Sequence, residues 1–192
     1  MKTFVINGNY NQDKPAPLSW YFLADSSLTN AGKPFFIPDF ADEFEAIPVI
    51  AVRINRLGKS ISGKYAARYY PEFAPAVHFR AKDLMSRLYS LHMPTDMACS
   101  FDRSFIMGDY IPFPEDKHIT VQLLRNGEKV SEFDTCNLSS NIDRVVAEVS
   151  KANTLKMGDI IVPGLAEGTQ VTIGDSLEIT ADGITSLSVQ IK

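Results

Sequence analysis

Two glutamates that stand two residues apart, Glu43 and Glu45, introduce an apolar run at residues 47–54. That run contains a single proline and is typical of a β-strand. Side chains of an extended chain alternate between its two faces, so a spacing of two puts both carboxylates on the same side. Like charges placed this way repel each other unless water or a cation lies between them. The pair therefore suits either a solvated strand edge or a cation site.

The two cysteines, Cys99 and Cys136, stand singly and form no CxxC motif. This usage fits a reducing cytosol and argues against a zinc ribbon or a disulfide scaffold. A buried free cysteine usually serves as a small apolar side chain. A nucleophilic Cys99 needs a neighbouring cation, such as Lys82 or Arg103, that lowers the pKa of its thiol. Both interpretations of Cys99 remain open at this point.

Composition excludes several classes of function. The 192 residues carry a net charge of −4, with 45% hydrophobic and 22% charged residues, as in an ordinary globular protein. No dense cluster of Lys and Arg indicates nucleic-acid binding, and no apolar run approaches the length of a membrane span. The start of the chain turns polar after Ile6, unlike a secretion signal, so we expect a cytoplasmic protein. Phosphate loops and dinucleotide fingerprints are absent from the sequence.

Strands predominate among the elements that must position these residues. Two β-rich runs between residues 118 and 133 flank Asn126-Gly127, a strong signal for a hairpin. Apolar and polar residues alternate again from residue 171 to the end, and residues 160–162 form a further short strand. Helices are predicted at residues 139–152, 81–91 and 62–70, with Arg80 and Lys82 at the start of the second.

These elements predict a mostly-β (α+β) fold with a few short helices. We expect a single domain over residues 1–192, in which residues 41–192 form a β-rich core. The N-terminal forty residues contain several prolines and are predicted to be irregular, with a short strand around residues 20–23.

The order of the motifs resembles the fumarylacetoacetate hydrolase family from about residue 7 to residue 191. The resemblance rests on EFEAIPVIAVRINRLGKSIS, AVHFRAKDL, CSFDRSFIMGDYI, the NGE hairpin, the block ending in TLKMGD, and IGDSLEI. It implies a mixed β-sandwich roll that assembles as a homodimer. It also implies hydrolysis, decarboxylation or isomerisation of a small 2-oxo or 1,3-dicarbonyl acid with a bound Mg²⁺ or Mn²⁺.

The resemblance supplies a candidate ligand set for that metal. Glu43 and Glu45 match the family's Glu-x-Glu pair, and His78 stands where the family has an aspartate. Because Mg²⁺ prefers oxygen ligands, the histidine favours Mn²⁺, Fe²⁺ or Zn²⁺ instead. Three protein ligands leave positions open for two oxygens of a substrate. The alternative for His78 is a hydrogen-bonded histidine of the core.

Other catalytic positions of the family are replaced. Cys99 stands where the family has a lysine, and the Asn-Tyr-x-x-His signature ends here in Asp13. Asp13 or a metal-bound hydroxide would then have to act as the base. Lys82 keeps the basic residue of Ala-Arg-Asp and is predicted to hold a substrate carboxylate, whereas Gly164-Leu165-Ala166 replaces the family's Gly-Thr-Pro turn.

The sequence and the family resemblance are compatible with three functions. The first is a metal-dependent hydrolase, decarboxylase or isomerase of a small carboxylic acid, with Lys82, Cys99 and Asp13 as catalytic candidates. The second is a catalytically degenerate relative that binds an acid or serves as a structural subunit. The third is a different chemistry built around Cys99. None of the three involves nucleic acid or a membrane.

Overall fold

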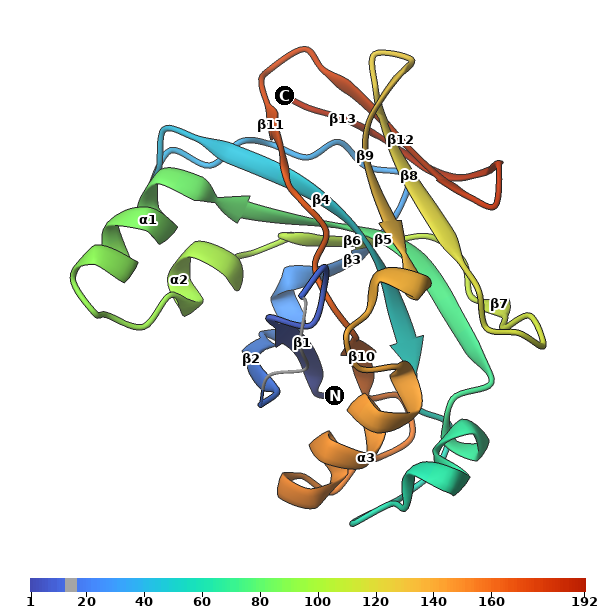
Figure 1. Ribbon diagram of the computed structural model, residues 1–192. Helices are drawn as coiled ribbons and strands as arrows, with labels where there is room; N and C mark the ends of the chain where they lie inside the picture. Colours follow the sequence, from blue (N-terminus) through green and yellow to red (C-terminus); the bar gives the residue numbers. More distant parts are fainter. Residues whose placement is uncertain (13–16) are drawn as a thin grey trace.

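The computed structural model describes residues 1–12 and 17–192, and these residues form two β-sheets with short helices around them (Figure 1). Within this part of the chain, the larger sheet has nine strands: β1 (Thr3–Asn7), β2 (Ser19–Leu23), β3 (Leu28–Asn30), β4 (Phe44–Arg53), β5 (Glu72–Ala81), β6 (Phe105–Met107), β7 (Ile111–Pro112), β10 (Ile160–Val162) and β11 (Thr169–Val171). The smaller sheet has β8 (Thr120–Arg125), β9 (Glu128–Asp134), β12 (Ser176–Ala181) and β13 (Ile184–Gln190). The predicted mostly-β fold is confirmed.

The helices are short. The α-helices are α1 (Lys82–Ser90), α2 (Asp96–Cys99) and α3 (Ile142–Ala152), and the 3-10 turns are η1 (Asp25–Ser27), η2 (Gly63–Tyr69) and η3 (Thr135–Asn137). In α3 the Asn141 side chain accepts the N–H of Arg144 at 3.0 Å, as an N-cap does, and the predicted apolar face is buried. The helix predicted at residues 62–70 is a 3-10 helix, and α2 was not predicted.

The long strands β4 and β5 pair antiparallel at the centre of the larger sheet. β11 and β10 cover the two ends of β4, at residues 44–46 and 52–53. Pro48 falls between these two stretches, where its missing N–H costs no hydrogen bond of the sheet. β4 can therefore be a buried central strand in spite of its proline.

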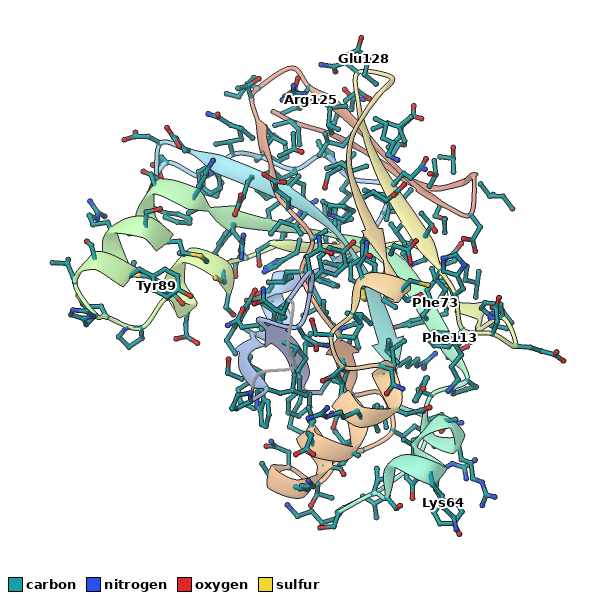
Figure 2. The ribbon with its side chains drawn as sticks, in the orientation of Figure 1. Lys64, Phe73, Tyr89, Phe113, Arg125 and Glu128 are labelled. Atoms are coloured by element: carbon teal, nitrogen blue, oxygen red, sulfur yellow. The ribbon has the colours of Figure 1, made fainter. Side chains whose placement is uncertain are left out.

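The Asn126-Gly127 hairpin is confirmed. Both residues have positive φ angles, 55° and 86°, as a two-residue type I′ turn requires. Arg125 and Glu128 face each other at the tip of the hairpin (Figure 2). The hairpin supplies two of the four strands of the smaller sheet.

The N-terminal portion is more regular than predicted. Besides the expected strand β2, it contains β1, which pairs with β2 and lies parallel to β10. β1 has five residues, of which only Phe4, Val5 and Ile6 are apolar, and its partner β10 lies more than 150 residues away in sequence. Among the described residues, no helix is long and apolar enough to cross a membrane.

Candidate active site

A buried ion pair lies on one face of the central strands. Glu45 on β4 stands directly opposite Arg80 on β5, and Glu45 is only 7% exposed. Arg80 Nε donates to Glu45 Oε1 at 2.9 Å, and Nη2 of the same guanidinium donates to the same oxygen. The guanidinium therefore neutralises a carboxylate that the surrounding strands remove from water.

His78 lies next to Arg80 on the same face and is fully buried. Its Nδ1 is 3.0 Å from the Ser104 carbonyl oxygen, which can only accept, so Nδ1 carries the proton. Nε2 then accepts a hydrogen bond from the Tyr21 hydroxyl at 2.8 Å. Burial lowers the pKa of His78 to about 3, and the charge of Arg80 acts in the same direction, while the bond to Ser104 opposes both. His78 is a neutral side chain with both ring nitrogens hydrogen-bonded.

The short helix α2 brings Cys99 to this group. Cys99 is fully buried, and burial raises the pKa of its thiol to about 11 although the charge of Arg80 lowers it. Burial, together with Cys99, also raises the pKa of the neighbouring Tyr21 well above its ordinary value. Both groups are therefore protonated at neutral pH. The cation beside Cys99 is Arg80, and it does not outweigh the effect of burial.

Of the predicted metal ligands Glu43, Glu45 and His78, the last two have other hydrogen-bond partners. Both nitrogens of His78 are engaged by Tyr21 and Ser104, and Oε1 of Glu45 is engaged by Arg80. Glu43 is exposed, and its carbonyl accepts the N–H of Lys82 at 2.8 Å. The ligand set therefore stays a prediction, and in this structure Oε1 of Glu45 and both ring nitrogens of His78 already have other partners.

Within residues 1–12 and 17–192, the one group of three potential metal ligands within 4.8 Å of one another is His118, Asp134 and Cys136. His118 Nε2 is 3.2 Å from Asp134 Oδ2, and His118 and Cys136 are exposed. The group borders a cavity of about 220 Å³ near the start of α3. It is separate from Glu45 and Arg80, and none of its members was predicted as a site residue.

A cleft of about 450 Å³ lies behind Glu45. Its walls come from the N-terminal segment, from β9 and from the segment before β11, and consist of Tyr10, Asn11, Val130, Ser131, Glu132, Glu167, Gly168 and Thr169. Gly168 separates this cleft from the ion pair, because a Cβ on Gly168 would overlap Oε2 of Glu45 and lie 2.6 Å from its Cδ. The missing side chain at Gly168 lets Glu45 lie directly behind the wall of the cleft.

The catalytic candidates occupy different places. Lys82 is exposed at the first position of α1, and Cys99 is buried beside Arg80. Asp13 lies outside the described residues. Of the Asn-Tyr signature, Asn9 has a structural role: its Nδ2 donates to the Ser140 and Pro163 carbonyls.

One member of the site, Tyr21, was missed from the sequence, and one was placed in the wrong element. Arg80 was assigned to the start of a helix, whereas β5 extends to Ala81 and so places Arg80 and His78 on the same face. The sequence did contain an indication of this placement, because residues two apart in a strand lie on the same face. Tyr21 carries no such signal, because its contact with His78 depends on the path of the whole sheet.

Comparison with known proteins identifies the family. A sequence model for the fumarylacetoacetate (FAA) hydrolase C-terminal region matches residues 5–192. The chain belongs to the fumarylacetoacetate hydrolase family. It is 25% identical over 165 residues to a mitochondrial oxaloacetate tautomerase of Mus musculus, covering 84% of this chain and 75% of the relative. It is 26% identical over 169 residues to an oxaloacetate tautomerase of Escherichia coli K12, covering 85% and 77%.

Solved structures of the family share this fold. The fumarylpyruvate hydrolase of Pseudomonas aeruginosa, in complex with Mn²⁺ and pyruvate, has a TM-score of 0.92 at 19% identity and covers 100% of this chain and 89% of its own. The 5-carboxymethyl-2-hydroxymuconate delta-isomerase of Mycobacterium smegmatis has a TM-score of 0.88 at 21% identity and covers 99% and 78%. The predicted fumarylacetoacetate hydrolase fold is thereby confirmed.

Proposed function

We propose that this family member catalyses keto–enol interconversion of a small 2-oxo or 1,3-dicarbonyl acid, with Arg80 holding a carboxylate of the substrate. The observation that carries the proposal is the Arg80 guanidinium, which is fixed by Glu45 yet keeps 18% of its side chain exposed. The family membership supports an enzyme of small acids. The oxaloacetate tautomerases among the relatives favour this reaction over the hydrolysis or decarboxylation that the family resemblance also implies.

Tautomerisation suits the groups that are present. It moves one proton from the carbon beside a carbonyl to the carbonyl oxygen and needs no water, oxidant or second substrate. Glu45 is the anionic side chain of the group and is our candidate proton acceptor. The Tyr21 hydroxyl already donates its hydrogen to His78, so the proton that Glu45 accepts from carbon is the one returned to the carbonyl oxygen.

The other predicted catalytic residues take smaller parts in this proposal. Lys82, exposed two residues beyond Arg80, adds positive charge that attracts an anionic substrate. Cys99, as a neutral thiol, forms part of the apolar wall beside Arg80. The role of Asp13 as a base remains a prediction. The homodimer also remains a prediction, and light scattering would distinguish it from a monomer of 21.3 kDa.

A second candidate function is supported by one observation. His78 and Cys99, two groups able to do acid–base or nucleophilic work, are both buried and neutral. Such a site can bind a carboxylic acid without converting it. The chain would then be a catalytically degenerate member of the family that acts as a binding protein.

The experiment is proton exchange at C3 of oxaloacetate in heavy water, followed by NMR with and without enzyme. We expect exchange above the uncatalysed rate, at least a hundredfold loss in Glu45→Gln, and little change in Glu72→Gln. Glu72 is the matched control, because it pairs with Arg53 across the same two strands but in solvent. Binding of oxaloacetate without faster exchange would favour the second candidate, and exchange unaffected by Glu45→Gln would refute the role of Glu45.

A further inference from the structure

We propose that the Arg80 guanidinium is the permanent cation of this site and binds the carboxylate of a 2-oxo or 1,3-dicarbonyl acid without a metal ion. The inference rests on the proposed function only for the class of ligand. The charge arrangement that supports it is the Glu45–Arg80 ion pair. It replaces the Mg²⁺ or Mn²⁺ implied by the family resemblance, and the Fe²⁺ or Zn²⁺ that His78 suggested.

The charge balance around Glu45 is complete without a metal. Glu45 and Arg80 carry opposite charges and are joined at 2.9 Å, and both ring nitrogens of His78 are held by Tyr21 and Ser104. A divalent ion bound to Glu45 would bring two further positive charges next to the guanidinium in a mostly buried place. Repulsion from the guanidinium opposes binding of the ion, whereas the same guanidinium attracts a carboxylate.

The position of Arg80 is fixed by the sheet. Glu45 and Arg80 are paired residues of β4 and β5, so the backbone register alone places their side chains together. A tethered cation competes with free ions at a high effective concentration. A metal ion bound through Oε1 would have to displace the guanidinium.

Arg80 also has donors left for a ligand. Its Nε–H and one N–H of Nη2 are directed at Glu45, and among the described residues its three other N–H groups have no protein acceptor. A guanidinium edge matches a carboxylate in a bidentate arrangement. The acid therefore binds as the second anion of Arg80, through the Nη1–Nη2 edge that adjoins the Nε–Nη2 edge held by Glu45.

The test measures pyruvate binding by calorimetry in chelator-treated protein, with pyruvamide as the neutral control ligand. All proteins carry His118→Ala and Cys136→Ser, so that metal at that separate group is not counted. We expect pyruvate binding that chelator does not weaken, no pyruvamide binding, and no Mn²⁺ binding up to millimolar concentration. Arg80→Ala should lose pyruvate binding at least tenfold and regain part of it with added guanidinium ion. Arg53→Ala, in the exposed pair of the same strands, should bind pyruvate as before.

Arg80→Ala should also acquire Mn²⁺ binding that Glu45→Gln abolishes, because the carboxylate then lacks its counter-charge. If Arg80→Ala does not fold, Arg80→Lys can be used instead. It keeps the positive charge but lacks the planar guanidinium that binds a carboxylate with two N–H groups, so it should weaken pyruvate binding about tenfold. The proposal is overturned if the protein with Glu45 and Arg80 intact needs metal to bind pyruvate, or binds Mn²⁺ in a way that depends on Glu45. Metal-dependent turnover would overturn this inference and uphold the proposed function. Metal-free binding of pyruvate without turnover would uphold this inference and refute the proposed function.

Discussion

The Tyr21 hydroxyl and Nε2 of His78 are joined by a 2.8 Å hydrogen bond, although their strands are not neighbours. Tyr21 lies on β2, which β1, β10 and β4 separate from β5 in the order of the larger sheet. The contact is possible because the sheet curls and brings β2 back toward β5 (Figure 1). The edge of the sheet thus closes the candidate active site.

Tyr21→Phe should destabilise the protein by about 1–3 kcal/mol, because it leaves the buried Nε2 of His78 without a donor. Chemical denaturation measures the effect. Tyr89→Phe is the matched control: Tyr89 is exposed on α1 (Figure 2), so its hydroxyl should contribute less than about 0.5 kcal/mol. Equal stability of Tyr21→Phe and wild type would mean that the hydrogen bond does not form in solution.

Stability should depend on pH through His78. Its pKa is about 3 in the folded protein and near the ordinary 6.5 in the unfolded chain, so between these values only the unfolded chain binds the proton. Stability from this group is complete above pH of about 6.5 and falls by up to about 1.4 kcal/mol per pH unit on acidification toward 3.

The measurement compares wild type with His78→Asn, whose amide can still donate to the Ser104 carbonyl. Unfolding free energies at several pH values from about 7 to 4.5 should fall more steeply in wild type, since carboxylates contribute equally to both proteins. Parallel curves would mean that His78 is solvated or already protonated in the folded state.

Gly168→Ala should disturb the ion pair without touching it chemically. The added Cβ would overlap Oε2 of Glu45, whose side chain cannot withdraw while Arg80 holds Oε1. We expect a loss of about 2–4 kcal/mol in unfolding free energy and at least a tenfold weaker binding of pyruvate. Gly63→Ala is the control, because no atom lies within 4 Å of a Cβ placed there. An unchanged affinity in Gly168→Ala would show that Glu45 does not position Arg80 for the ligand.

Local patterns predicted much of the fold. The Asn126-Gly127 turn and the capped helix α3 could be predicted because the turn residues, the cap and the apolar face all lie within a few residues of one another. α2 has only four residues and β1 only five, too few to establish a period.

The candidate site was only partly predictable. Glu45, His78 and Cys99 were identified as residues of interest, but their partners come from elsewhere in the chain. The pairing of Glu45 with Arg80 depends on the β4–β5 register, and the pairing of Tyr21 with His78 on the curl of the sheet. Those partners engage two of the expected metal ligands, Glu45 in an ion pair and His78 in two hydrogen bonds.

The two cysteines should differ sharply in reactivity. Cys99 is fully buried, and its pKa of about 11 leaves on the order of one thiolate in ten thousand at pH 7. Cys136 is exposed. A small alkylating reagent should therefore modify one thiol of the native protein, and Cys136→Ser should remain unmodified until it is unfolded by denaturant. Rapid alkylation in native Cys136→Ser would show a reactive Cys99 and would restore the chemistry built around this residue as the leading function.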